Sequence, residues 1–242
     1  MTSVQEHYDE HLGSIYAWMV GGTEAAIERG TAELDAIGVS PSIGAVAVDL
    51  GTGFGMHSIP LARRGFEVVA IDSSAVMLDE LSRQANGLTI RAICDDLLSF
   101  PQHLSVKAEL VLCMGDTVTH LPDEQYVERL LATVRESLAG DGRLVITLRD
   151  YSTALTGDRR FIPVRSDENR IFVCFLEYSD TRVRVNDILH QREGLQWKMS
   201  VRSYDKLRIK PERLDDLLRR NGFAVTRDLN ASGMLRFIAR HA

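Results

Sequence analysis

A short apolar run that leads directly into three closely spaced glycines constrains the fold of this chain more than any other feature. Residues 46–50, Val-Ala-Val-Asp-Leu, have the composition of a buried strand, and glycines follow at every second position. Glycines let the backbone turn tightly and approach a ligand closely. In an open α/β sheet, such a loop lies at the carboxyl end of its strand, where ligands bind. We therefore predict a cofactor-binding loop that contains Asp49, Gly51, Thr52, Gly53 and Gly55.

Strands and helices alternate along the chain up to about residue 150. Segments with helical spacing separate apolar runs at residues 46–50, 67–72, 88–94, 109–114 and 143–148. This alternation is typical of βαβ units, which form a parallel sheet with right-handed crossovers. The first forty residues also have helical spacing, with a break at Gly21-Gly22, and Thr23 is expected to cap the second helix.

After Tyr151, strand-like segments follow one another without helices between them. Strand-like segments at residues 172–178, 182–191 and 197–209 are joined by connections too short for crossover helices, so we expect antiparallel pairing. A final helix begins at Pro211, and residues 223–227 and 234–239 are expected to form a terminal antiparallel pair.

Composition and charge exclude several classes of function. The 242 residues are 45% hydrophobic, with a formal net charge of −6, which suits one domain with a sizeable core. No basic stripe is present, which argues against nucleic acid or an anionic membrane as partner. No apolar run approaches the ~18 residues of a membrane span, and the polar N-terminus lacks a signal-peptide pattern.

Cysteine and histidine patterns point away from disulfides and metals. Cys94, Cys113 and Cys174 are odd in number and form no CxxC pair, so we expect reduced thiols in a cytoplasmic protein. Residues 7–11 match the HxxEH pattern of zinc-binding helices. No third ligand is evident, and we expect no metal.

Polar residues also follow the second and third strands of the predicted sheet. Asp72 ends the second strand, where a carboxylate accepts hydrogen bonds from both hydroxyls of a ribose. Asp95 follows the third strand and suits the exocyclic amine of an adenine, with Leu97 packed on the ring; a helix cap is the alternative role for Asp95. The cofactor-binding residues expected at these two positions are Asp72, Ser73, Met77, Asp95, Asp96 and Leu97.

The loop after the fourth strand faces the reactive end of a ligand laid across the strand ends. Met114 and Gly115 are expected to contact the cofactor, because glycine permits close approach. Asp116, Thr117 and His120 supply polar groups that can meet a substrate.

The order and spacing of these four strand ends resemble class I methyltransferases that use S-adenosylmethionine (SAM), over roughly residues 40–150. Within that superfamily the chain is similar to the glycine/sarcosine N-methyltransferase group and its small-molecule relatives. The likeness rests on three segments: residues 53–61 (GFGMHSIPL), residues 113–123 (CMGDTVTHLPD, where the group tends to have CLGNSFAHLPD) and residues 149–151 (RDY, where it has RNY). Asp116 and Asp150 replace two asparagines of the group. Carboxylates there would suit a cationic or donor-rich acceptor and would repel a substrate carboxylate.

The resemblance implies a Rossmann-like α/β fold. We expect a seven-stranded, mostly parallel sheet with its last strand antiparallel, helices on both faces, and a small antiparallel insertion after the fifth strand. Residues 1–242 then form a single domain. Its parts are a helical lid (1–40), a SAM-binding core (41–150), an antiparallel cap (151–210) and a final helix with a β-hairpin (211–242).

The resemblance also implies transfer of methyl from SAM to nitrogen or oxygen of a small-molecule metabolite, with S-adenosylhomocysteine as product. The candidate catalytic residues are Asp116, His120 and Asp150. The candidate substrate-binding residues are Asp116, Arg149, Asp150, Tyr178 and Arg184. Tyr16 and Trp18 are expected to line the lid and to favour the sulfonium by cation–π contact.

Alternative functions and partners stay open at this stage. The same fold supports an intramolecular reaction of SAM, or a SAM-binding subunit without catalysis. A NAD-dependent oxidoreductase is disfavoured, because Met56 stands where the dinucleotide-binding GxGxxG pattern requires glycine. A homodimer is compatible with the sequence, which does not fix the oligomeric state.

Overall fold

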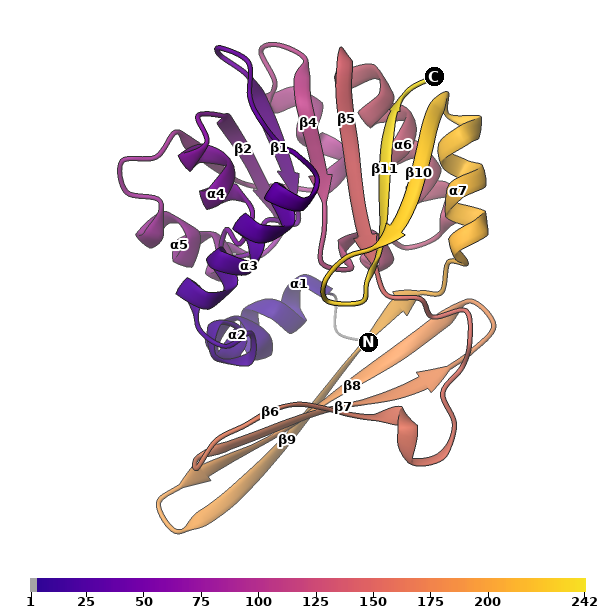
Figure 1. Ribbon diagram of the computed structural model, residues 1–242. Helices are drawn as coiled ribbons and strands as arrows, with labels where there is room; N and C mark the ends of the chain where they lie inside the picture. Colours follow the sequence, from indigo (N-terminus) through magenta and orange to yellow (C-terminus); the bar gives the residue numbers. More distant parts are fainter. Residues whose placement is uncertain (1–3) are drawn as a thin grey trace.

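The computed structural model describes residues 4–242 and is built around one central sheet (Figure 1). Seven strands run in the order β10-β11-β5-β4-β1-β2-β3. Their bounds are β1 Val46–Leu50, β2 Glu67–Asp72, β3 Ile90–Cys94, β4 Ala108–Cys113, β5 Leu138–Leu148, β10 Phe223–Leu229 and β11 Leu235–His241. Strands β1 to β5 are parallel, whereas β11 is antiparallel to both β5 and β10. The predicted mostly parallel sheet with an antiparallel last strand is confirmed.

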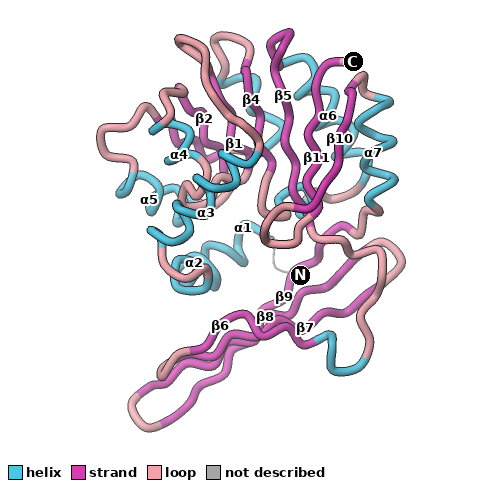
Figure 2. Tube along the Cα trace, viewed as in Figure 1, coloured by secondary structure: helices cyan, strands magenta, loops and turns pink. Residues whose placement is uncertain are grey.

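Helices cover both faces of this sheet (Figures 1 and 2). One apolar core packs side chains of α3 (Thr23–Ala36), α4 (Ser58–Arg63) and α5 (Ala75–Gln84) against the sheet. The other core packs α6 (Glu124–Ser137), α7 (Pro211–Arg220) and the 3₁₀ segment η2 (Leu97–His103) against the opposite face. A regular three-layer structure results, and it fixes the carboxyl ends of the parallel strands along one edge.

The N-terminal segment lies at that edge. It consists of α1 (Val4–His7), a single π-helical turn, η1 (Tyr8–Leu12), and α2 (Gly13–Met19). Figure 1 shows it at the lower end of the sheet, towards which the arrow of β5 points. Single π turns are rare and occur frequently at functional sites. Residues 1–3 of the predicted lid lie outside the described part of the chain.

A separate four-stranded antiparallel sheet, here called the cap, also lies at that edge (Figure 2). Its strand order is β6-β7-β8-β9, with bounds β6 Phe161–Ser166, β7 Arg170–Tyr178, β8 Arg182–Glu193 and β9 Gln196–Leu207. The sequence pattern predicted three strands and missed β6. This edge strand contains Pro163 and a register shift before Arg165, and all of its residues are exposed, so it has no alternating apolar pattern.

Smaller differences from the sequence prediction concern element boundaries. Helix α3 begins at Thr23 but has Gly22 as its N-cap, without a side-chain cap bond. Strand β5 begins at Leu138 instead of residue 143. Within residues 4–242, no helix is both long and apolar enough to span a bilayer.

Candidate functional site

The glycine loop after β1 is held by a chain of buried hydroxyl and carboxylate groups. Ser58 Oγ donates to Asp49 Oδ2 at 2.7 Å and lies 2.7 Å from Thr52 Oγ1. Asp49 is 2% exposed, so its carboxylate is buried beneath the loop and fixes it through this hydrogen bond. Gly51 has a φ of 71°, and a Cβ there would lie 2.5 Å from the Thr117 side chain. Only glycine fits this position, because the loop after β1 touches the loop after β4.

Asp72 lies at the end of β2, beside the glycine loop, as the sequence predicted. Its carboxylate accepts hydrogen bonds from the backbone N–H of Gly53 (2.8 Å) and of Ser74 (2.9 Å). Burial raises the pKa of Asp72, and these two bonds act in the opposite direction. Ser73 lies between the two contacts, and the buried Met77 packs against Phe54 of the loop.

The end of β3 divides the expected adenine-binding residues between two structural roles. Asp96 Oδ1 accepts from the N–H of Leu98 and caps η2. Asp95 Oδ2 lies 2.8 Å from His103 Nε2, and this bond lowers the pKa of Asp95. The helix-capping role that was the alternative for Asp95 is therefore performed by Asp96. Leu97 begins η2 and is half-buried.

Asp116, after β4, is the most highly connected carboxylate of the site. It is fully buried, with the left-handed φ of 78°, at the start of η3 (Thr117–His120). It accepts hydrogen bonds from Lys206 Nζ (2.6 Å), Tyr151 OH (2.8 Å), Arg149 N (2.8 Å) and Arg149 Nη1 (3.3 Å). Burial acts to raise the pKa of Asp116, but the charges of Lys206 and Arg149 outweigh it and hold the pKa well below its usual range.

This environment changes the expectation that Asp116 presents a negative charge to a cationic acceptor. Lys206, from β9 of the cap, is itself 5% exposed and pairs with it directly. Four donors use the roughly four lone-pair positions of one carboxylate. The geometry therefore gives Asp116 the role of tying β4, β5 and the cap together. Its predicted role as a base stays a prediction.

His120 ends the same 3₁₀ turn and faces a cluster of aromatic rings. Its ring centroid lies 5.5 Å from that of Tyr204 and 6.0 Å from that of Tyr8. Burial and the nearby Lys206 cation lower the pKa of His120 to about 3. The imidazole is therefore neutral at neutral pH, and its buried Nδ1 has no hydrogen-bond partner.

The N-terminal segment covers the glycine loop. Asp9 Oδ1 accepts from Ser74 Oγ at 2.5 Å, and the Tyr16 ring lies 5.8 Å from that of Phe54. Tyr8 lies between Tyr16 and His120, although sequence reasoning had not selected it. Trp18 faces the cap instead: its Nε1 donates to Asp167 Oδ2 at 2.5 Å.

A buried hydrogen bond that the sequence did not predict joins the N-terminal segment to the cap. His7 Nε2 lies 2.8 Å from Asp187 Oδ2, and both residues are 1% exposed. Cys174 Sγ donates to the other carboxylate oxygen at 3.0 Å. The partners are 180 residues apart in sequence. No local pattern could have paired them.

The remaining predicted substrate residues lie further from this cluster. Asp150 is exposed and accepts from the N–H of Ser152 in a turn. Arg184 is exposed on the cap and pairs with Asp205 at 2.9 Å. Tyr178 is half-buried beneath the guanidinium of Arg208. Of the predicted acceptor residues, the structure brings Asp116, Arg149 and His120 together and leaves these three outside.

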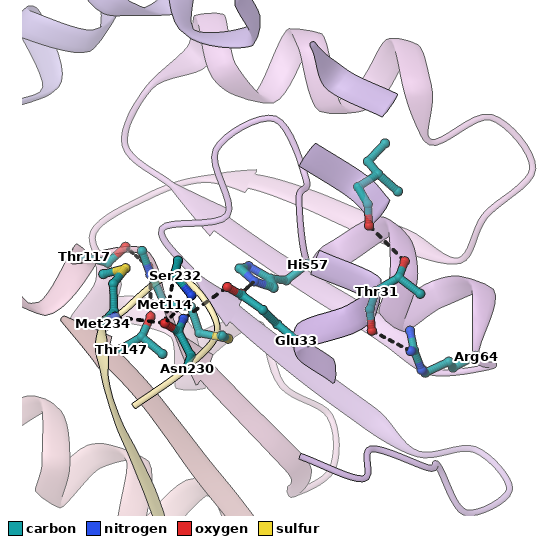
Figure 3. A network of polar contacts seen from close by, with 12 residues as sticks. Thr31, Glu33, His57, Arg64, Met114, Thr117, Thr147, Asn230, Ser232 and Met234 are labelled. Carbon is teal, nitrogen blue, oxygen red and sulfur yellow. Dashed lines mark hydrogen bonds and ion pairs between the residues drawn. The ribbon is translucent and has the colours of Figure 1, made fainter. Parts of the chain in front are cut away.

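Figure 3 shows a polar network behind the glycine loop. Glu33 of α3 accepts from Asn230 Nδ2 at 3.1 Å and lies 2.8 Å from His57 Nε2. It thereby links α3, the start of α4 and the loop between β10 and β11. Nearby, the N–H of Gly115 donates to Thr147 Oγ1, and Thr117 donates to the carbonyl of Met114, which fixes the loop after β4.

These groups fit the chemistry of SAM. Asp72 offers carboxylate oxygens at the strand end where a ribose is expected, and a Cβ on Gly115 would meet nothing within 4 Å, which leaves room beside the loop. The buried rings of the roof are apolar surfaces for a sulfonium. Among residues 4–242, no group of three or more His, Cys, Asp and Glu side chains is arranged to hold a metal ion.

Comparison with known proteins agrees with this arrangement. Residues 47–142 match the family model described as a methyltransferase domain. The chain is 32% identical over 110 residues to glycine/sarcosine N-methyltransferase of Aphanothece halophytica and 30% identical over 110 residues to that of Halorhodospira halochloris. These matches cover 45% of this chain and 42% and 41% of the relatives, so the chain matches about two fifths of their length.

Solved structures extend the likeness to the whole fold. CcbJ methyltransferase from Streptomyces caelestis has a TM-score of 0.79 at 18% identity and covers 97% of this chain and 98% of its own. SAM-bound CalS10, an amino pentose methyltransferase from Micromonospora echinaspora, has a TM-score of 0.75 at 18% identity, with 95% and 96% covered. The predicted Rossmann-like α/β fold is thereby confirmed.

Proposed function

We propose that this protein transfers the methyl group of SAM to a nitrogen of a small molecule, with oxygen as the alternative acceptor atom. The observation that carries the proposal is a glycine loop with carboxylates at adjacent strand ends, directly beneath a buried polar cluster from three parts of the chain. Nitrogen is favoured because the curated relatives are N-methyltransferases.

The cofactor would lie across the carboxyl ends of the strands. Asp72 would hold the ribose, residues 95–97 the adenine, and Asp49 with the glycine loop the methionine end. SAM supplies an electrophilic methyl group on a sulfonium. Tyr8 and Tyr16 would cover it, because both rings lie over the loop side of the site. Fixed alignment of two reactants can contribute about 7–11 kcal/mol to a transfer reaction.

Side chains of the protein would orient the acceptor amine and exclude water from it. A nucleophilic amine needs a free lone pair, and neutral His120 can accept a hydrogen bond from the amine N–H at its unpartnered Nδ1 and so orient that lone pair. The roof formed by the N-terminal segment excludes water, which strengthens the fixed dipoles inside. Lys206 and Asp116 hold the cap against the core, so we assign them positioning roles.

An amine that carries hydroxyl groups suits this site. Buried His7 Nδ1, His11 Nε2 and His120 Nδ1 lack partners within the described structure, and each can bond a hydroxyl. Two structural neighbours are an amino pentose methyltransferase and a sugar N-methyltransferase. Glycine or sarcosine is the second candidate, because two curated relatives are glycine/sarcosine N-methyltransferases.

A product assay tests this proposal. The purified protein is incubated with SAM and with glucosamine, glycine or sarcosine, and the products are analysed by mass spectrometry. Formation of S-adenosylhomocysteine together with a methylated amine supports transfer. Consumption of SAM without S-adenosylhomocysteine would favour the intramolecular reaction. SAM binding with no turnover on any amine or hydroxy compound would favour a subunit without catalysis.

Compartment and domain organisation are part of the same proposal. The three cysteines are unpaired among the described residues, which suits a reducing compartment, and we place the protein in the cytoplasm. We propose one domain with a helical lid (1–40), a SAM-binding core (41–150), an antiparallel cap (151–210) and a final helix with a β-hairpin (211–242).

A further inference from the structure

The outer face of the cap, turned away from the N-terminal segment, is unusually apolar. In an antiparallel sheet with one face in solvent, outward positions are normally polar. The inward positions here are apolar as expected: Phe172 and Leu189 pack against Leu12 and Ile15 of the N-terminal segment. Many outward positions towards the far end of the cap are apolar as well, although Asn186, His190 and Ser203 also lie on this face.

Strand register places these outward residues on one continuous surface. Val173, Ile188 and Val201 are opposite one another across β7, β8 and β9, and Pro163 of β6 continues the row. The neighbouring row contains Ile171, His190 and Met199, and at the other side Phe161 packs on Phe175 with ring centroids 4.6 Å apart. The apolar residues of this outer cap face are Phe161, Pro163, Ile171, Val173, Phe175, Ile188, Trp197, Met199 and Val201.

Several of these side chains are well exposed. Met199 is 60% exposed, Phe161 49%, Trp197 47%, Val201 41% and Ile171 40%. Isolated exposed apolar residues are ordinary, but a contiguous patch of this kind marks an interaction site. Among residues 4–242, the guanidinium of Arg160 lies 4.7 Å from the centroid of the Phe175 ring, whereas Phe161, Met199 and Val201 stay exposed.

We propose that the outer cap face is the interface of a homodimer, in which the caps of two copies pack face to face about a two-fold axis. A twisted, apolar sheet face can pack on another copy of itself, as in aligned sheet packing. With strands about 4.8 Å apart and a rise of about 3.3 Å per residue, four strands of six to twelve residues present a face of roughly 600 Å². A standard interface buries about 800 Å² per partner, so this face would supply most of such an interface.

The charges at the two ends of the face favour a crossed arrangement. Glu177 and Asp205 lie beside Arg184 at the end nearest the core, whereas Arg192 lies at the far end, next to the hairpin turn. A two-fold axis across the strands sets the acidic end of one copy against the Arg192 end of the other. This inference concerns assembly and does not depend on the identity of the acceptor.

The oligomeric state of the 242-residue protein tests this proposal. We predict a particle of twice 27.0 kDa by light scattering and native mass spectrometry, with a dissociation constant below about 100 µM. The double variant M199E/V201E should weaken the dimer at least ~10-fold, because it places charges in a dry apolar contact. S-adenosylhomocysteine affinity and melting temperature of the separated monomer report whether the variant folds.

A matched control uses apolar residues that are equally exposed elsewhere. Ile43 is 107% exposed and Val106 56% exposed on the core, so I43E/V106E should leave the dimer intact. Should M199E/V201E fail to fold, Ile171→Lys on β7 serves as the second cap variant. A wild-type protein that is monomeric at about 100 µM would overturn the proposal. So would a dimer that the cap variants leave intact, or one that the control variant breaks.

Discussion

At the scale of single residues, Asp116 determines how the site is held together. Removing a carboxylate from water costs several kcal/mol, and the charge of Lys206 together with three further donors offsets this cost. Breaking such a pair leaves the remaining charge buried without a partner. The cost of losing one partner therefore exceeds the net contribution of the intact pair.

Replacement of Lys206 by methionine should lower the free energy of unfolding by about 3–5 kcal/mol, measured by urea denaturation. Lys198→Met is the matched control, because Lys198 lies on the same strand and pairs with Glu193 at 3.4 Å in solvent. Exposed pairs contribute about 0–1 kcal/mol, so the control should change stability little. A loss below about 1 kcal/mol for Lys206→Met would contradict the role given to this pair.

His120 should make stability depend on pH. Because its pKa is lowered to about 3 in the folded protein, the unfolded chain binds a proton here below about pH 6.5 that the folded chain does not. Stability is therefore highest above pH 6.5 and falls with decreasing pH, by about 2 kcal/mol between pH 7 and pH 5 from this group alone.

The variant His120→Gln should lose that part of the pH dependence when unfolding free energies at pH 7 and pH 5 are compared. His190→Gln on the outer cap face should keep it. Equal pH dependence in wild type and His120→Gln would show that the imidazole is not held neutral by burial.

At the scale of elements, the sequence predicted what depends on local pattern. Alternating apolar runs located the five parallel strands and the terminal pair, and glycines located the loop after β1. Contacts between distant segments, such as Asp116 with Lys206 and His7 with Asp187, were not predicted. These contacts form because the cap packs on the core. Residues so far apart in the chain show no periodic sequence pattern that would reveal them as partners.

The contact of α3 with the glycine loop offers a test at this scale. Alanine is better than glycine in a helix interior by about 1 kcal/mol, so propensity alone predicts that Gly30→Ala stabilises α3. A Cβ on Gly30 would, however, overlap the carbonyl oxygen of Met56, and backbone cannot yield cheaply. We predict a net loss of about 1–3 kcal/mol from overpacking, measured by thermal melting.

Gly140→Ala is the control, because a Cβ there meets nothing within 4 Å and the φ is not in the left-handed region. It should change the melting temperature little. A Gly30→Ala protein more stable than wild type would mean that α3 does not press on the loop as the structure shows.

At the scale of the whole molecule, three parts of the chain meet at the carboxyl edge of the sheet (Figure 1). The core supplies the glycine loop and Asp72, the N-terminal segment supplies the aromatic roof, and the cap supplies Lys206, Tyr204 and Asp187. The core was predictable because its loops follow strands in a fixed order. The residues expected to bind the acceptor were predicted only in part, because their positions depend on how the cap packs against the core.

The most direct test of the central proposal is calorimetric titration of SAM and S-adenosylhomocysteine into the wild-type protein, Asp72→Asn and Asp79→Asn. We predict micromolar binding of both compounds to wild type. Loss of charged hydrogen bonds at about 1.5–3 kcal/mol should weaken binding to Asp72→Asn roughly 10–100-fold. Asp79→Asn, exposed on α5, should bind like wild type. A folded wild-type protein that binds neither compound would contradict the proposed use of SAM and return the nicotinamide alternative to consideration.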